Sequence, residues 1–133
     1  MGLTVLDAGV VIALLDASDA HHEVCIGALR EARDSGARLV LPASAYAECL
    51  VGPSRRGSEA VAVVDDLLDT LPIGVEPISR EVAAAAASLR AAHGRSLRLP
   101  DALVLATAWA LGADLVLTTD GGWPACGLSV TVL

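Results

Sequence analysis

Two short apolar runs in this chain each end directly on an aspartate. Leu3–Leu6 leads into Asp7, and Leu115–Thr119 leads into Asp120. Runs of four or five residues that are rich in Val, Leu and Thr are typical of buried strands. We therefore expect two strands of one sheet that each deliver a carboxylate at the end of the strand.

The rest of the chain alternates strands with helices, and this alternation predicts an α/β fold with a mostly parallel central sheet. Between two of the helices, Gly52–Gly57 predicts a flexible break. The predicted strands cover residues 3–6, 38–41, 74–78, 115–118 and 129–133. The predicted helices cover residues 8–15, about 18–33 (capped by Ser18 or Asp19), 42–51 (capped by Ser44), 58–71, 80–93 and 99–111.

The size and composition favour a single cytoplasmic domain that spans residues 1–133. Hydrophobic residues make up 54% and aromatic residues 2% of the chain, so we expect a core of Val, Leu, Ile and Ala. No apolar run reaches the roughly 18 residues that a membrane span needs, and the start of the chain lacks the features of a signal peptide. Cys25, Cys49 and Cys126 form no CxxC pair, which predicts reduced thiols that fill the core.

The net charge is −7, and all nine basic side chains are arginines. A nucleic-acid-binding protein normally carries a basic surface, so this balance argues weakly against general nucleic-acid binding. The objection weakens if part of the negative charge belongs to one acidic site, because bound divalent cations would offset that part. Arginine also binds phosphate in a two-pronged geometry that lysine lacks.

Two further acids are expected near the same edge of the sheet as Asp7 and Asp120. Glu48 lies on the helix that follows the second strand, and Asp101 follows Pro100 at the start of a later helix. In an open parallel sheet, functional groups collect beyond the carboxyl ends of the strands. Two unit charges about 4 Å apart repel by about 4 kcal/mol at an effective dielectric near 20. Such a cluster needs a cation or must hold protons, which favours a divalent metal site.

Each acid also has an ordinary structural interpretation when it is taken alone. Asp101 fits a helix start, where the helix dipole favours a carboxylate by roughly 0.3–1 kcal/mol. Asp7 fits a helix cap, Glu48 a solvated helix position, and Asp120 a turn. The functional interpretation therefore depends on the combination of the four.

Four segments resemble the successive motifs of PIN domains, and the resemblance spans essentially the whole chain. The closest likeness is to the small single-domain toxins of VapBC toxin–antitoxin pairs. The segments are Leu6–Ala13, Glu48, Leu99–Leu103 with Ala106–Ala108, and Leu117–Asp120. The resemblance implies a PIN-like three-layer α/β/α domain with endoribonuclease activity that depends on Mg²⁺ or Mn²⁺. It makes tRNA and rRNA candidate substrates.

The resemblance also implies roles for individual residues. Thr118 matches a hydroxyl residue that orders the site through hydrogen bonds. Gly121–Gly122 departs from the pattern, because many relatives carry another acid there, and this leaves a second metal position open. The four family acids, each implied to act in catalysis and metal binding, correspond in order to Asp7, Glu48, Asp101 and Asp120.

The resemblance further implies a cognate antitoxin protein as partner, an RNA substrate and a homodimer. Arg95 and Arg98 lie close in sequence to the third acid and are candidate contacts for RNA phosphates or for ordering the site. Trp123 fits either a loop anchor or a platform on which a base stacks.

Other protein classes also place an aspartate after the first strand. A phosphotransfer enzyme of the haloacid dehalogenase type needs a second aspartate two residues later, where this chain has Gly9. A response-regulator receiver needs a lysine, and this chain has none. The remaining alternative is a catalytically inactive PIN-like module that binds RNA or acts as a scaffold.

Overall fold

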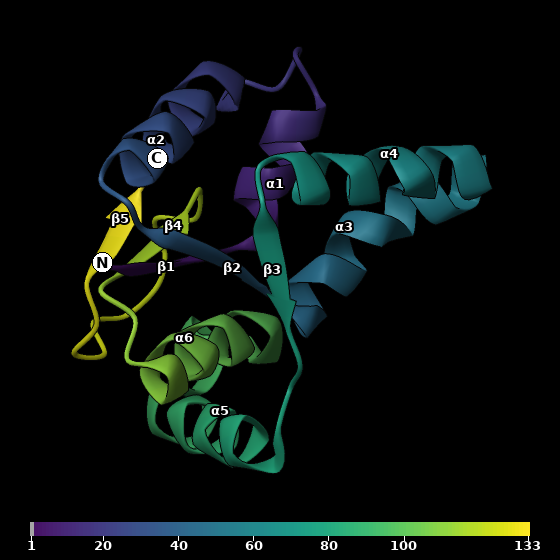
Figure 1. Ribbon diagram of the computed structural model, residues 1–133. Helices are drawn as coiled ribbons and strands as arrows, with labels where there is room; N and C mark the ends of the chain where they lie inside the picture. The colour runs from purple at the N-terminus through teal and green to yellow at the C-terminus, as the bar shows by residue number, and fades with distance from the viewer. Residues whose placement is uncertain (1) are drawn as a thin grey trace.

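A five-stranded sheet forms the centre of the protein, seen in a computed structural model that describes residues 2–133 (Figure 1). The strand order is β3-β2-β1-β4-β5, and every neighbouring pair is parallel. The sheet is thus wholly parallel, which confirms the predicted class. The strands are β1 (Leu3–Leu6), β2 (Arg38–Pro42), β3 (Ile73–Glu76), β4 (Leu115–Thr118) and β5 (Val130–Val132).

Helices cover both faces of this sheet. Figure 1 shows α1 (Ala8–Leu15) and α2 (His22–Asp34) on one face, and α5 (Arg80–His93) and α6 (Leu99–Leu111) on the other. A second pair, α3 (Ala43–Arg56) and α4 (Ser58–Thr70), projects past the β3 side of the sheet. A short 3-10 helix, η1 (Gly94–Ser96), precedes α6. This arrangement confirms the predicted three layers.

The core consists of small aliphatic side chains, as the composition predicted. Val5, Leu6 and Val116 on the central strands are almost completely buried. Strands that are covered on both faces are apolar throughout, which explains the continuous apolar runs in the sequence. Cys25 and Cys49 are buried free thiols in this core, and burial raises the pKa of Cys49 to about 12.

The predicted break at Gly52–Gly57 is wrong. Helix α3 continues through Pro53, which is buried, as far as Arg56. The chain then reverses at Gly57 alone, whose φ of 123° suits a residue without a β-carbon. The Tyr46 hydroxyl donates to Asp65 Oδ1 at 2.6 Å and ties α3 to α4. This packing outweighs the local tendency of Gly and Pro to end a helix.

Two predicted helix caps are also wrong. Helix α3 begins one residue after Pro42, so Ser44 lies inside its first turn and makes no cap hydrogen bond. Helix α2 begins only at His22. The side chains of Asp16 and Asp19 accept hydrogen bonds from backbone N–H groups two residues on, which forms turns that delay the helix start.

None of the helices in the described part of the chain is long and apolar enough to cross a membrane.

Candidate functional site

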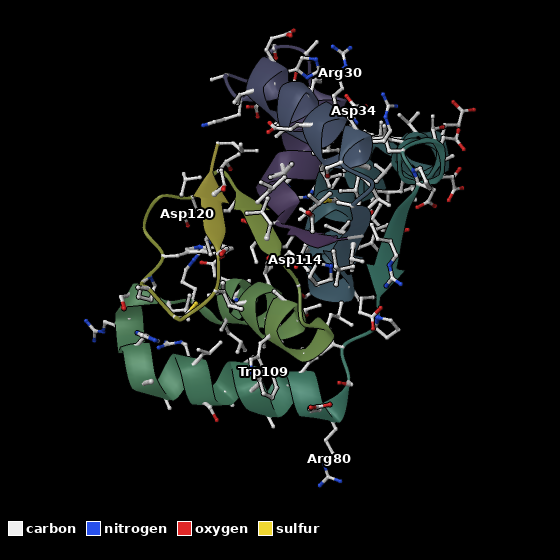
Figure 2. All side chains as sticks on the ribbon, turned by 60° about the vertical axis from the view of Figure 1, so that its left-hand side comes forward. Arg30, Asp34, Arg80, Trp109, Asp114 and Asp120 are labelled. Carbon is white, nitrogen blue, oxygen red and sulfur yellow. The ribbon has the colours of Figure 1, made fainter. Side chains whose placement is uncertain are left out.

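The four predicted acids lie around the carboxyl ends of the central strands. Asp7 directly follows β1, and Asp120 lies two residues beyond the end of β4. Glu48 is carried by α3, which begins at the end of β2, and Asp101 lies in the first turn of α6. Figure 2 labels Asp120 and Asp114, which flank β4 at its two ends and so mark the edge with the acids and the opposite edge.

Asp7 is the most highly organised of the four. It is 8% exposed. Its Oδ1 accepts a hydrogen bond of 2.8 Å from the backbone N–H of Ala8 and so caps α1. Its Oδ2 accepts a hydrogen bond of 2.8 Å from the Thr118 hydroxyl. That hydroxyl in turn accepts from the backbone N–H of Asp120 at 3.0 Å. One threonine therefore joins the ends of β1 and β4.

The charges of Asp7, Asp101 and Asp120 act on the pKa values of neighbouring acids at this edge of the sheet. Burial, followed by the charge of Asp7, raises the pKa of Asp101. Burial also raises the pKa of Glu48, and the charges of Asp7 and Asp101 add to this effect, although Glu48 lies on an exposed position of α3. Burial has the largest effect on the pKa of Asp7 and raises it. The hydrogen bonds from Thr118 and Ala8 lower this pKa, and the charge of Asp120 raises it.

Arg98 is the cation nearest to these acids. Its Nε lies 3.5 Å from Asp101 Oδ2, and its charge lowers the pKa values of Asp7, Glu48 and Asp101. The Arg98 side chain is 75% exposed, so solvent screens this pair and its contribution to stability is small. Arg95 is an exposed residue of η1 that forms no ion pair with the described residues and does not influence these pKa values. The structure thus brings Arg98 to the acids but not Arg95.

Asp120 is both a turn residue and a member of the acidic set. Its Oδ1 accepts a hydrogen bond of 2.8 Å from the backbone N–H of Gly122, so the structural interpretation made from sequence holds. Its charge nevertheless raises the pKa values of Asp7 and Asp101. Asp120 is exposed, so it lies on the outer side of the site.

Gly9 has a packing role that the sequence analysis did not identify. A β-carbon at this position would lie 2.5 Å from Thr119 Oγ1, which is closer than real contacts allow. The absence of a side chain lets the first turn of α1 approach the segment after β4. Gly9 therefore helps to bring Asp7 and Asp120 together.

The donor set fits a hard divalent cation. All four side chains offer oxygen, which Mg²⁺ and Mn²⁺ prefer. No three His, Cys, Asp or Glu side chains of residues 2–133 form a ready-made ligand group. Mg²⁺ keeps several waters and needs only one or two protein carboxylates. Buried carboxylates of like charge also gain from a cation, because it offsets both burial and repulsion.

Asp120 lines a surface cavity of about 280 Å³ beside Trp123. A surface cavity of about 650 Å³ lies at the opposite, amino-terminal edge of the strands, beside Arg33 and Arg38. The carboxylates with perturbed pKa values lie at the acidic edge and not beside this cavity, and such groups cluster at functional sites. An open edge is also compatible with a polymeric substrate.

A sequence model of the PIN domain matches residues 4–126 of this chain. No curated protein sequence matches it significantly.

Solved structures give the same picture of the fold. VapBC2 from Rickettsia felis, bound to a DNA fragment from its promoter, is similar with a TM-score of 0.76 and 13% identity over 98% of each chain. VapC20 from Mycobacterium tuberculosis, described as a sarcin-ricin loop cleaving toxin, has a TM-score of 0.70 and 20% identity over 89% of this chain and 90% of that one. FitAcB from Neisseria gonorrhoeae has a TM-score of 0.70 and 24% identity over 96% and 95%.

Proposed function

Since this chain belongs to the PIN domain family, we propose that it is a metal-dependent endoribonuclease and the toxin of a toxin–antitoxin pair. The observation that carries this proposal is the position of Asp7, Glu48, Asp101 and Asp120 at one edge of the sheet, where the charge of Asp7 raises the pKa values of Glu48 and Asp101. A scaffold would gain nothing from clustered negative charges, whereas a nuclease uses them to hold a cation.

The positions of the residues support the roles that we propose for them. Asp7 and Asp101, the two buried acids, would hold Mg²⁺ or Mn²⁺. Glu48 and Asp120 are more exposed than these two acids. They would complete the metal site or orient the attacking water. When bound, the cation would supply an activated water and offset the charge on the phosphate. Thr118 fixes the orientation of the Asp7 carboxylate through its hydrogen bond to Oδ2.

Arg98 would contact the substrate. Its guanidinium is largely exposed and lies against Asp101, and it can bind a phosphate of the RNA in a two-pronged geometry. Arg95 is exposed and lies three residues before Arg98. It would contact a neighbouring phosphate of the RNA backbone. Attack by water leaves a 5′-phosphate and a 3′-hydroxyl, so the 2′-hydroxyl is not needed as a nucleophile.

The similar structures support the proposed partners. VapC20 is described as a toxin that cleaves the sarcin-ricin loop, and another similar structure is a toxin–antitoxin complex from Klebsiella pneumoniae, with a TM-score of 0.61 and 20% identity. We propose a structured RNA such as tRNA or rRNA as the substrate, and a cognate antitoxin that blocks the site. We also propose that residues 1–133 act as one domain, as a homodimer in the cytoplasm.

RNA cleavage by purified variants tests the proposed activity. Wild-type protein should cleave tRNA or rRNA with Mg²⁺ or Mn²⁺ and should stop in EDTA. Asp7→Asn and Asp101→Asn should each lose cleavage, whereas Asp66→Asn, which changes an exposed aspartate of α4, should cleave like wild type. Equal cleavage by wild type and both site variants would reject the proposal, and a wild type that binds RNA without cutting it would favour the inactive module.

A further inference from the structure

One hydroxyl beside the acidic site lacks a hydrogen-bond partner. Ser44 Oγ is buried from solvent, and no atom of the described chain accepts or donates a hydrogen bond to it. A buried hydroxyl without a partner is unfavourable, because it has lost its hydrogen bonds to water and gained none in the protein. Ser44 does not cap α3, because the helix starts earlier and Pro42 occupies the cap position. The fold itself therefore does not explain this serine.

The position of Ser44 is close to the acids. In the parallel pairing of β1 with β2, Val5 lies opposite Val40. The same register continued for two residues places Asp7 level with Pro42, two residues before Ser44. The serine thus lies in the first turn of α3, at the edge of the sheet where the carboxylates meet.

Ser44 also lies on the same face of α3 as Glu48, one turn earlier. Side chains four residues apart on a helix have β-carbons about 5–6 Å apart. Because side chains on a helix lean toward its N-terminus, Glu48 leans over the turn that contains Ser44. The charges of Asp7 and Asp101 also act on the Glu48 carboxylate.

We propose that Ser44 is a positioning residue of the acidic site, whose hydroxyl donates a hydrogen bond to the Glu48 carboxylate, directly or through one water, when a divalent cation is bound. This inference rests on the proposed function. A bound cation offsets the repulsion from Asp7 and Asp101 and lets Glu48 turn inward. The serine then holds that carboxylate in one orientation and gains the partner that it otherwise lacks.

Mn²⁺ binding tests this role without measuring cleavage. Free Mn²⁺ can be counted by its paramagnetic resonance signal in mixtures with wild type, Ser44→Ala, Ser44→Thr and the control Ser54→Ala. Ser54 is an exposed serine farther along the same helix. Ser44→Ala should weaken Mn²⁺ binding about 10-fold, which is typical for the loss of a group that orients a metal ligand. Ser44→Thr should bind within about threefold of wild type, and Ser54→Ala should be unchanged.

Melting in EDTA separates positioning from folding. Ser44→Ala should melt at or above the wild-type temperature, because it removes a buried hydroxyl that has no partner. The inference is overturned if Ser44→Ala binds Mn²⁺ like wild type, or if it melts lower in EDTA and Ser44→Thr does not restore binding. The proposed function fails separately if wild type and Asp7→Asn bind Mn²⁺ equally, or if wild type binds none.

Discussion

The hydroxyl of Thr118 donates a hydrogen bond of 2.8 Å to Oδ2 of Asp7, across two neighbouring parallel strands. Both residues are buried. The same hydroxyl accepts from the backbone N–H of Asp120, so its single proton is committed to Asp7. This bond favours the ionised carboxylate and opposes the effect of burial on the Asp7 pKa.

Replacing Thr118 by valine should destabilise the fold by about 1–3 kcal/mol, because the charged Asp7 and the Asp120 N–H both lose a buried partner. The Asp7 pKa should rise further, and metal binding should weaken. Urea denaturation at neutral pH measures the change in free energy of unfolding. Thr118→Ser keeps the hydroxyl and should retain most of the stability, so equal losses in the two variants would show that the bond contributes little.

Replacing Asp101 by asparagine should stabilise the protein in EDTA at neutral pH. Burial and the charge of Asp7 raise the Asp101 pKa above its usual value of 3.8. The ionised form is therefore disfavoured in the folded state, and this penalty is present above the folded pKa and disappears as the pH falls toward the unfolded value. The melting temperature of Asp101→Asn should exceed that of wild type at pH 7.5 and approach it near pH 4.

The control for this experiment is Asp66→Asn, which removes one exposed negative charge from α4. It should shift the melting temperature little at either pH. If Asp101→Asn melts below wild type at pH 7.5, the pair with Arg98 outweighs burial, and the sign of the electrostatic argument is wrong.

Mg²⁺ should raise the melting temperature of the wild-type protein. A ligand at ten times its Kd stabilises the folded state by about 1.4 kcal/mol, which corresponds to several degrees for a domain of this size. Asp7→Asn should abolish most of this rise, because it removes a buried carboxylate from the site. Differential scanning fluorimetry in millimolar MgCl₂ and in EDTA measures both values. A rise of equal size in the variant would mean that the cation binds elsewhere.

Replacing Gly9 by alanine should destabilise the protein by about 1–3 kcal/mol, because the new β-carbon would clash with Thr119 Oγ1 at 2.5 Å. Adding Thr119→Ala should recover much of the loss, which a double-mutant cycle measures. Gly27→Ala is a matched control within α2, where a β-carbon would meet nothing within 4 Å. It should instead stabilise the helix by about 0.5–1 kcal/mol. Equal effects of the two alanines would contradict the close approach at Gly9.

The strands and the shared acidic edge could be predicted because each depends on short stretches of sequence. Leu3–Leu6 and Leu115–Thr118 are apolar throughout, and a parallel sheet gathers whatever follows its strands at one edge. The continuation of α3 through Pro53 could not be predicted in this way, because packing on α4 decides it. In the sequence, Gly9 was informative only because no aspartate stands at that position. Its packing role could not be predicted, because the Thr119 side chain that it contacts lies 110 residues away in the chain.

The position of Ser44 within α3 could not be predicted from the sequence either. A serine before a helical segment is typical of a cap, but the strand β2 runs into α3 at Pro42 and moves the helix start forward. Its spacing of four residues from Glu48 was a usable signal. Arg95 and Arg98 could not be separated by sequence, because their different relations to Asp101 depend on the turn made by η1.

The order of the strands has a consequence for the folding of the chain. Strand β1 lies in the middle of the sheet, beside β4, which comes last but one among the strands of the chain. The hydrogen bond between Thr118 and Asp7 therefore joins residues 111 positions apart. Such a contact forms only after a large loop has closed, so the acidic edge should be completed late in folding.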